Sequence, residues 1–452
     1  MLFSFYSTAV VSGTLLISNT CAQSNPDNIV DSSKRARLAA SSLMQWYDAS
    51  SGLWETTGWW NAANILTMLG NFAQADPEDV YLVTLARTVF AVALRHAPTK
   101  NPNPEAERPD NSTVKTLRSL RVGTGYHKIV DPTTHVPHAV YPDGWSISSD
   151  RSFNLTALAS QIDNDPKLAA FIPDPYDFLD GYYDDDLWWA LAWIKAYDVT
   201  DYEPYLTLAE GIFNAVSKVW PTTCNNGGIY WNSDKKYVNA IANELFFSTA
   251  AHLANRAYDE DDYYQKWAER SLSWFLDLGM LSSNGTINDG LDENCQNNHG
   301  DVWSYNQGVI LGGLVEMHEI DYNNTYLGLG LYIAYTAIEV LTSPYPGFKY
   351  TLTDPCEPND CGADGTQFKG IFMRNLMSLW DATKDKLLGD YISANAFNIW
   401  HYDREIGAQG HVVFGVQWEK FSGIANASTQ SSAMDALVAD IVVTKADLLH
   451  KF

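Results

Sequence analysis

The sequence predicts an all-α protein folded as an (α/α)6 toroid, a single domain of about twelve helices in six antiparallel pairs. Three observations support this prediction. Apolar residues recur with a spacing near 3.6 in a series of separate segments, and no convincing pattern of parallel strands lies between them. No low-complexity linker divides the 452 residues. Amphipathic helices without a sheet bury their apolar faces only against one another.

The predicted helices fall into two groups. Three lie at 31–47, 61–72 and 78–96, and nine lie at 186–197, 202–219, 239–255, 262–278, 302–319, 326–341, 366–380, 386–400 and 429–448. Between the groups, residues 100–180 are rich in Pro, Asp, Ser and Thr, and their alternation is too weak to predict strands. That stretch is too long for an ordinary connection, so it is either a functional lid or partly disordered. We favour a surface insertion over the cavity.

The N-terminal residues 1–22 have the pattern of a secretory signal peptide. An apolar run at 9–17 is followed by small residues around Ala22. The run is too short to span a bilayer, so we expect no stable membrane insertion. We therefore expect a secreted chain whose mature domain covers 23–452.

The cysteines and glycosylation sequons agree with secretion. Removing Cys21 with the signal leaves four cysteines, and Cys356 and Cys361 are close enough in sequence to form a local disulfide. Cys224 then pairs with Cys295, since neither the spacing nor nearby histidines favour zinc. The sequons are at Asn111, Asn154, Asn284, Asn323 and Asn426.

The net charge and the aromatic content limit the classes of molecule that this protein could bind. A net charge of -25 excludes a binder of the nucleic-acid backbone, which requires a cationic surface. The chain has 16 Trp and 25 Tyr, many beside Asn, Asp and Gly in turn-like segments. This combination favours a carbohydrate. No histidine or cysteine spacing indicates a metal site, and we expect no cofactor.

The most informative motif is Asp184-Asp185-Asp186, which lies between Tyr182-Tyr183 and Trp188-Trp189 at the start of a predicted helix. Helix capping requires one Asp or two, and explains neither the third nor the aromatic residues. Closely packed carboxylates raise at least one pKa, which gives the one protonated and one ionised carboxyl that glycosidases use. Catalysis is therefore the favoured interpretation, and capping the alternative.

Several segments together resemble glycoside hydrolase family 76, the endo-α-1,6-mannanases of bacteria and fungi. The segments are 58–64, 182–193, 227–232, 243–246, 303–308 and 368–372, and the Asp pair followed by Trp-Trp is the most specific. The resemblance implies an (α/α)6 fold and a retaining mechanism without metal. It makes Asp184 the nucleophile and Asp185 the acid/base. Asp186 leaves the register open to a pair of Asp185 with Asp186, but counting back from Trp188 favours the first.

Further residues of these segments are candidates for substrate binding, with core packing or helix capping as the alternative for each. They are Trp59, Trp60, Asn64, Tyr183, Trp231, Asn243, Glu244, Tyr305, Asn306 and Gln307. The lipid-anchored fungal relatives end in a long apolar tail, whereas residues 442–452 have no such pattern, which favours free secretion.

The leading functional hypothesis is hydrolysis of internal α-1,6-mannosidic bonds in mannan or a mannoprotein glycan by a monomer. One alternative is a cell-wall mannan transglycosylase that uses the same Asp pair. The other is a non-catalytic mannan-binding protein, which the intact Asp pair disfavours. The sequence does not separate hydrolysis from transglycosylation, because a sugar hydroxyl replaces water in the same second step.

Overall fold

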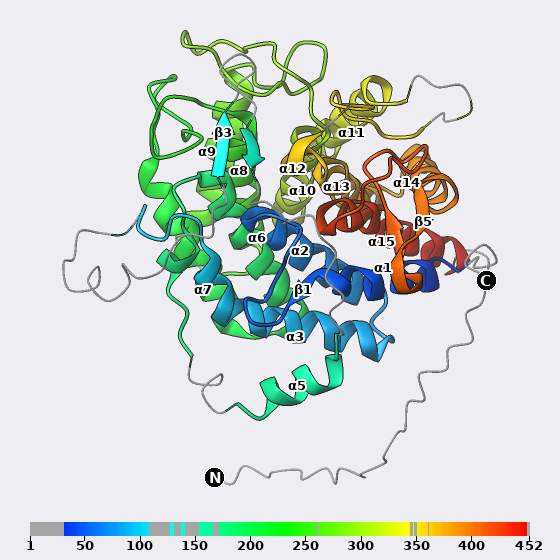
Figure 1. Ribbon diagram of the computed structural model, residues 1–452. Coiled ribbons are helices and arrows are strands. Elements are labelled where there is room, and N and C mark those ends of the chain that lie inside the picture. The colour runs from blue at the N-terminus through cyan, green and yellow to red at the C-terminus, as the bar shows by residue number, and fades with distance from the viewer. Residues whose placement is uncertain are drawn as a thin grey trace, which may run out of the picture.

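The computed structural model describes residues 31–106, 108, 127–130, 137–140, 153–165, 171–258, 261–343, 347, 350–359 and 361–449. Its architecture is the predicted (α/α)6 toroid (Figure 1). The predicted signal peptide and Asn111 lie outside the described residues.

Six helices form the inner ring. They are α2 (Trp59–Ala75), α6 (Tyr183–Thr200), α8 (Ala240–Ala254), α10 (Ser304–Asp321), α13 (Phe368–Thr383) and α15 (Ala427–Leu449). Each contacts the next in this order, and α15 contacts α2, so the ring is closed. Inner helices are apolar or buried around most of their circumference, which is typical of helices enclosed by others.

Six further helices cover the ring from outside (Figure 1). They are α3 (Val80–His96), α7 (Glu203–Val216), α9 (Tyr263–Asp277), α11 (Asn324–Val340), α14 (Lys386–Asn398) and α1 (Ser32–Leu43). The first five each pack on the inner helix that precedes them in sequence, whereas α1 packs on α15. Several begin at side-chain caps, as where Asp79 accepts the amide protons of Tyr81 and Leu82 at the start of α3.

All twelve predicted helices are present, with ends shifted by a few residues. The described part of the chain also has helices that the periodicity did not predict: α5 (Leu155–Asp163), which packs on α3, and the one-turn α12 (Gly362–Gly365). Short 3₁₀ or π segments extend several elements, at Met44–Trp46, Ala97–Lys100, Pro175–Phe178, Ser217–Val219 and Ile399–Asp403.

Three small antiparallel hairpins accompany the helices. Their strands are β1 (Tyr47–Asp48) with β2 (Leu53–Trp54), β3 (His127–Val130) with β4 (Pro137–Val140), and β5 (Arg404–Ile406) with β6 (Val412–Phe414). The second hairpin lies in the predicted insertion, where weak alternation gave no strand prediction. Four residue pairs join its strands, from His127 opposite Val140 to Val130 opposite Pro137. The backbone of β4 contacts α12.

Two glycines let the inner helices approach closely near their first turns. A Cβ at Gly308 of α10 would lie 2.6 Å from the Cα of Phe372 on α13, and one at Gly370 of α13 would lie 2.6 Å from the Cα of Ser432 on α15. Side chains larger than hydrogen would push these helices apart. These two glycines therefore let α13 pack closely against both α10 and α15.

Both predicted disulfides are present. Cys224 and Cys295 are bonded with their Cα atoms 5.4 Å apart, and Cys356 and Cys361 with theirs 5.0 Å apart. Of the described sequon residues, Asn154, Asn284 and Asn323 are exposed, and Asn426 is half-buried at the start of α15, where its side chain accepts the amide proton of Thr429.

One segment within the described residues, Val80–Lys100, is long and apolar enough to cross a membrane. It consists of α3 and the 3₁₀ turn that follows, and Leu85, Ala86, Val89 and Phe90 on it are completely buried in the hydrophobic core. Its apolar composition therefore matches its packing in the toroid.

Candidate active site

The first turns of the six inner helices lie at one end of the toroid, which we call the mouth. Their last turns lie at the other end, which we call the base. All three aspartates of the sequence motif are in the first turn of α6, because the helix begins at Tyr183 rather than near Asp186 as predicted. The positive end of the helix dipole favours carboxylates at this position. Asp184 is 6% exposed, and Asp185 and Asp186 are completely buried.

Asp184 is held by the indole of Trp231. The Nε1–H of Trp231 donates a hydrogen bond of 3.1 Å to Oδ2 of Asp184, and Oδ1 has no hydrogen-bond partner among the described residues. The carbonyl of Trp231 accepts the amide proton of Tyr183 at 3.0 Å, and its ring packs edge-on against Tyr182 with centroids 5.0 Å apart. The Trp231 loop therefore fixes both the start of α6 and one carboxylate oxygen of Asp184.

Asp186 has a different environment. Its Oδ1 accepts the amide proton of Asp180 at 2.9 Å, and Oδ1 of Asp180 accepts that of Tyr182 at 2.9 Å. These two bonds fold the chain back onto the first turn of α6. Asp186 thus fixes the entrance to the helix.

Glu244, in the first turn of α8, is a buried carboxyl without a described hydrogen-bond partner. It is completely buried, and neither oxygen is hydrogen-bonded within the described chain. Burial raises its pKa well above the usual value, which favours the protonated form of the carboxyl. Ser248 and His252 follow at intervals of four residues and line a cavity on the ring axis, so Glu244 lies on the axial face of α8.

Asp289 adds a further carboxyl from the loop before α10. The hydroxyl of Tyr237 donates to its Oδ2 at 2.5 Å, and the amide of Asn298 donates to that hydroxyl at 3.0 Å. Burial, together with the charges of Asp301 and Asp184, raises the pKa of Asp289 to about 7 despite the Tyr237 hydrogen bond. Asp184 and Asp289 therefore interact electrostatically.

Aromatic rings form the floor and one wall of the mouth. Trp188, one turn after Asp184, stacks on Trp60 with centroids 5.8 Å apart, and Trp60 donates its Nε1–H to Asp364 at 2.7 Å. Tyr305 stacks on Phe368 at 3.8 Å. Burial, and then the charges of Asp289, Asp184, Glu244 and Asp364, raise the pKa of Tyr305. Tyr305 is thus near four carboxyl groups of the mouth, those of Asp184, Glu244, Asp289 and Asp364.

Asn243 and Gln307 use their amides to hold loops. Oδ1 of Asn243 accepts the amide proton of Ile229, and its Nδ2 donates to the carbonyls of Ile229 and Asn239. Gln307 repeats this pattern with the amide and carbonyl of Ile287 and the carbonyl of Trp303. Each side-chain amide thus makes two hydrogen bonds with one loop residue, to its amide and to its carbonyl, as the backbone of a neighbouring β-strand would.

The other four predicted binding residues are buried. Trp59 packs in an aromatic cluster, with ring centroids 4.7 Å from Trp189 and 6.2 Å from Phe178. Asn64 accepts a hydrogen bond from Arg374 and donates to the carbonyl of Trp60, one turn below the mouth. Tyr183 is buried, and so is Asn306, whose amide atoms have no hydrogen-bond partner in the described chain.

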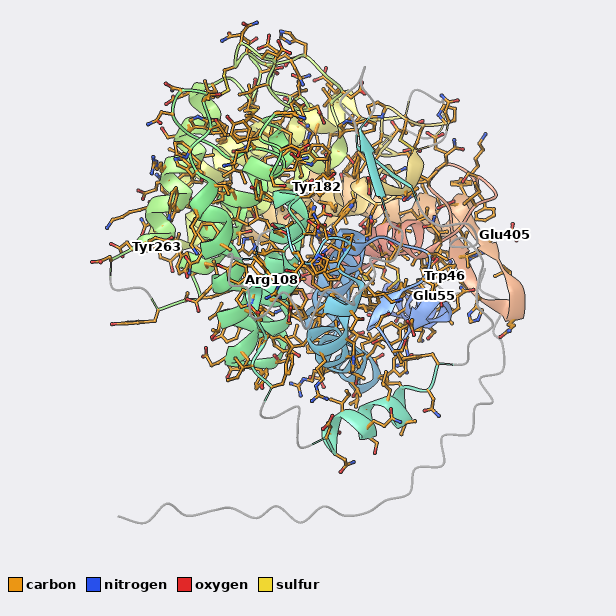
Figure 2. All side chains as sticks on the ribbon, turned by 60° about the vertical axis from the view of Figure 1, so that its left-hand side comes forward. Trp46, Glu55, Arg108, Tyr182, Tyr263 and Glu405 are labelled. Atoms are coloured by element: carbon orange, nitrogen blue, oxygen red, sulfur yellow. A yellow bond between two sulfur atoms is a disulfide. The ribbon has the colours of Figure 1, made fainter. Side chains whose placement is uncertain are left out.

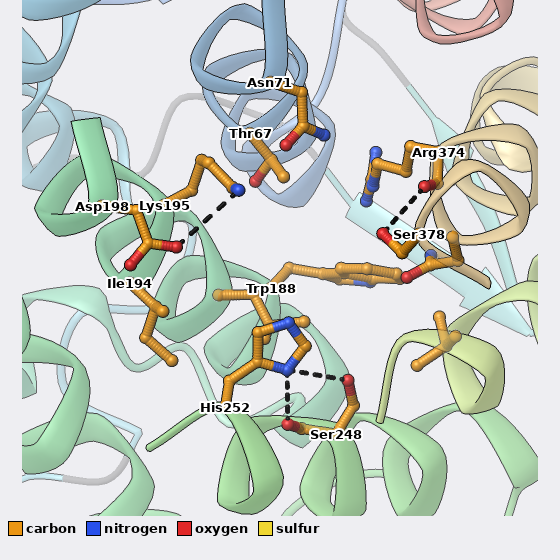
Figure 3. Close-up of a pocket in the computed structure, with 13 residues that line it drawn as sticks. Thr67, Asn71, Trp188, Ile194, Lys195, Asp198, Ser248, His252, Arg374 and Ser378 are labelled. Atoms are coloured by element: carbon orange, nitrogen blue, oxygen red, sulfur yellow. Dashed lines mark hydrogen bonds and ion pairs between the residues drawn. The ribbon is translucent and has the colours of Figure 1, made fainter. Parts of the chain in front are cut away.

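The base has a small cavity of about 70 Å³ on the ring axis (Figure 3). Trp188 lies at its centre, with Lys195 and Asp198 on one side and Arg374 and Ser378 on the other. Nearby, Arg256 pairs with Asp198 at 2.7 Å and with Glu316 at 2.8 Å, and Nε2 of His252 lies 3.3 Å from Glu316. Trp188 therefore separates the mouth from an ion-paired base.

Sequence reasoning missed Asp289, Asp364 and the floor position of Trp188. Asp289 lies in a loop, 284–291, that is rich in Gly and Asn, and a lone Asp there has no special signal. Asp364 comes to the mouth on the one-turn α12, where it accepts the indole proton of Trp60 on α2. Trp188 lies one turn after Asp184, and this helical spacing was the only available indication.

Buried carboxyl groups and aromatic rings together at the mouth of a helical toroid are the arrangement expected of a glycoside hydrolase. The sequence profile described as glycosyl hydrolase family 76 matches residues 140–451, more than half of the chain. The chain therefore belongs to glycosyl hydrolase family 76.

Named relatives are consistent with this assignment. Mannan endo-1,6-alpha-mannosidase DCW1 of Candida albicans is 31% identical over 209 residues, which cover 43% of this chain and 46% of that protein. A putative mannan endo-1,6-alpha-mannosidase of Schizosaccharomyces pombe is 26% identical, with 66% of this chain and 70% of that protein covered. The aligned region is thus less than half of the first relative.

A solved structure with the same fold is an inactive variant of the α-1,6-mannanase GH76A of Salegentibacter sp. HEL1_6, in complex with α-1,6-mannotriose. It has 17% sequence identity and a TM-score of 0.59, and the superposition covers 91% of this chain and all of that one. At this identity the likeness establishes the fold.

Proposed function

We propose that this protein hydrolyses internal α-1,6-mannosidic bonds of mannan with retention of configuration, using Asp184 as nucleophile and Asp185 as acid/base. The observation that carries the proposal is the buried Asp pair in the first turn of α6, with one oxygen of Asp184 held by Trp231. The names of the relatives support the substrate. The Salegentibacter variant is inactive with two consecutive aspartates replaced, a pattern that agrees with the pair.

The chemistry follows from the two carboxyl groups. Oδ1 of Asp184 attacks the anomeric carbon while the bond from that carbon to the glycosidic oxygen breaks, and Asp185 gives its proton to the leaving oxygen. Water then attacks the anomeric carbon of the glycosyl-enzyme. Asp185 accepts a proton from this water, and Asp184 leaves as a carboxylate.

The environment of Asp186 supports the register of the pair. Asp186 is engaged with the amide of Asp180 and fixes the helix entrance, whereas Asp184 is the partly exposed member of the three and interacts with Asp289 and Tyr305. In this proposal Asp186 is a structural neighbour of the pair.

The remaining mouth residues divide into binding and supporting roles. Protonated Glu244 donates a hydrogen bond to a sugar hydroxyl, Asn306 donates and accepts one, and Trp60, Trp231 and Tyr305 offer ring faces to the sugar. Asn243 and Gln307 hold the loops. Trp59, Asn64 and Tyr183 support these groups from the surrounding core.

We further propose that the protein is a secreted monomer made of a signal peptide at 1–22 and one catalytic domain at 23–452. Two disulfides and three exposed sequons support a secretory route. The partner is mannan or a mannoprotein glycan. The insertion at 100–180 contributes to the rim of the mouth, since β4 contacts α12 and α12 carries the Asp364 that Trp60 binds.

The deciding experiment is incubation with linear α-1,6-mannan, followed by mass analysis of the products. Shorter chains support the proposal, longer or exchanged chains indicate transglycosylation, and unchanged mannan indicates a binder. The control is the double variant Asp184→Asn/Asp185→Asn, which lacks a carboxylate of the pair in either register, so products that persist with it come from another enzyme in the preparation.

A further inference from the structure

A groove of about 600 Å³ is lined in part by Trp231, the residue whose indole binds Asp184. Its walls are the loop that carries Trp231 and the loop that follows Asp289. The lining includes Tyr230, Trp231, Asn232, Tyr237, Glu293 and Asn298. The volume is within the range of about 300–1,000 Å³ that is usual for sites of small ligands.

The groove and the catalytic centre share two side chains. Trp231 lines the groove and also donates its Nε1–H to Asp184. Tyr237 lines the groove and donates its hydroxyl proton to Asp289, which interacts with the charge of Asp184. Trp231 and Tyr237 therefore connect the lining of the groove directly to two carboxyl groups of the mouth.

The walls of the groove are fixed to each other. Cys224 lies on one wall and Cys295 on the other, and a disulfide joins them. The amide of Leu291 donates to the carbonyl of Val238 at 2.9 Å. Asn243 holds the first loop at Ile229 from inside the toroid. The shape of the groove is thus built into the fold and does not require a ligand.

The lining suits a neutral ligand with many hydroxyl groups. Aromatic rings offer apolar faces, and amide and carboxylate oxygens accept hydroxyl protons. Among the described lining residues Lys236 is the cation, and it lies 3.8 Å from Asp234, so Asp292 and Glu293 make the groove acidic and unfavourable for phosphate or an acidic glycan. No group of three His, Cys, Asp or Glu side chains in the described chain could hold a metal ion.

We propose that this groove is a second carbohydrate subsite, which binds sugar residues of the same glycan beyond the residue attacked by Asp184. The inference rests on the proposed function, because it requires a glycan at the mouth. In this proposal the groove makes the enzyme prefer longer or branched chains, because only such a chain extends from Asp184 past Trp231.

The test measures affinity without turnover. In the Asp184→Asn background, binding of linear α-1,6-mannooligosaccharides from mannobiose to mannohexaose, and of branched mannan, is measured by calorimetry. Affinity should rise with chain length, and Tyr230→Ala or Glu293→Gln should reduce the affinity for the longest or branched ligand by about tenfold. Tyr230→Phe, which keeps the ring, should retain most of it.

Matched controls are Tyr258→Ala and Glu405→Gln, which change exposed residues remote from the groove. Tyr258 is 89% exposed, and Figure 2 shows Glu405 at the edge of the molecule, away from Tyr182. If the groove variants lose affinity only for branched mannan, the groove binds a branch of the glycan. If they also lose affinity for linear chains, the groove binds the main chain. If affinity rises with length but no groove variant changes it, the subsite is refuted and the proposed function stands. If no mannooligosaccharide binds, the proposed function itself fails.

Discussion

The mouth and the base of the toroid treat buried carboxyl groups in opposite ways. At the mouth, none of the ion pairs between described residues includes Asp184, Glu244 or Asp289, and the pKa values of Glu244 and Asp289 are raised by burial. At the base, Glu316 is also largely buried, but the charges of His252 and Arg256 outweigh burial and lower its pKa to about 2.

This difference shows how one fold separates stability from reactivity. Ion pairs at the base join the ends of α6, α8 and α10 through Asp198, Arg256 and Glu316. The mouth positions its acids with neutral donors, such as the indole of Trp231 and the hydroxyl of Tyr237. Neutral donors hold a carboxyl in place without neutralising its charge, so it stays available for chemistry.

The largest expected effect is at the mouth. Asp184→Asn should lower kcat on α-1,6-mannan by at least about 10⁴-fold, since no glycosyl-enzyme forms, and leave the unfolding transition near that of the wild type. Asp185→Asn should still react with an activated aryl mannoside, and added azide should increase its turnover. Steady-state kinetics check both. If Asp186→Asn were inactive while Asp184→Asn kept appreciable activity, the pair would be Asp185 with Asp186.

At the base, the expected effect is on stability. Glu316→Gln leaves Arg256 with one carboxylate partner fewer and should lower the free energy of unfolding by roughly 2–4 kcal/mol, with kcat unchanged. Urea unfolding followed by circular dichroism measures this change. The control is Glu319→Gln, at an exposed position on the same helix, which should cost less than about 0.5 kcal/mol. Equal losses in the two variants would show that the base network contributes little.

Asp289 gives a prediction about pH. Its folded pKa of about 7 is above the unfolded value near 4, so the folded protein binds the proton more tightly, and stability falls as pH rises from about 4 to 7. Asp289→Asn cannot ionise and should remove part of this fall, roughly 2–3 kcal/mol. Melting temperatures from pH 4.5 to 7.5 provide the comparison. Parallel profiles for variant and wild type would show that Asp289 is already ionised at pH 4.5.

The smallest expected effect is that of replacing Glu244 on kcat/KM. Because its protonated carboxyl acts as a hydrogen-bond donor in our proposal, Glu244→Gln should retain kcat/KM within about threefold, whereas Glu244→Leu should lose about tenfold or more. The pH profile of kcat/KM separates this role from packing, since Glu244→Gln should leave it unchanged. A profile that shifts with Glu244→Gln would identify Glu244 as an ionised group in the wild type.

The helices were predictable because their apolar faces are buried, and this leaves a period in the sequence. The β3–β4 hairpin and α12 were not, since short elements of four residues have too few positions to show a period. The disulfide pairing was predictable because, of the four cysteines that remain after the signal peptide, two lie close together in sequence and leave the other two to pair. The structure confirms both bonds.

The acidic motif at Asp184 was visible because three consecutive aspartates are unusual before a Trp pair. Asp289 reaches the mouth on a loop and Asp364 on the one-turn α12, both far from Asp184 in sequence, and no local pattern marks such a residue. Asn243 and Gln307 were candidates for substrate contact because amides bind hydroxyl groups. The structure shows that the same amides pair with the backbone of Ile229 and Ile287, an interaction that no single-sequence pattern identifies.

The pairing of α1 with α15 has a consequence for folding during synthesis. Ser32 donates to Asp440, and Gln430 donates to the carbonyl of Ala39, across 408 and 391 residues of chain. The buried face of α1, with Ala36, Ala39 and Leu43, has no final partner until α15 has left the ribosome. Ring closure is therefore a late step in translation, and until then α1 is an amphipathic helix whose apolar face lacks its partner on α15.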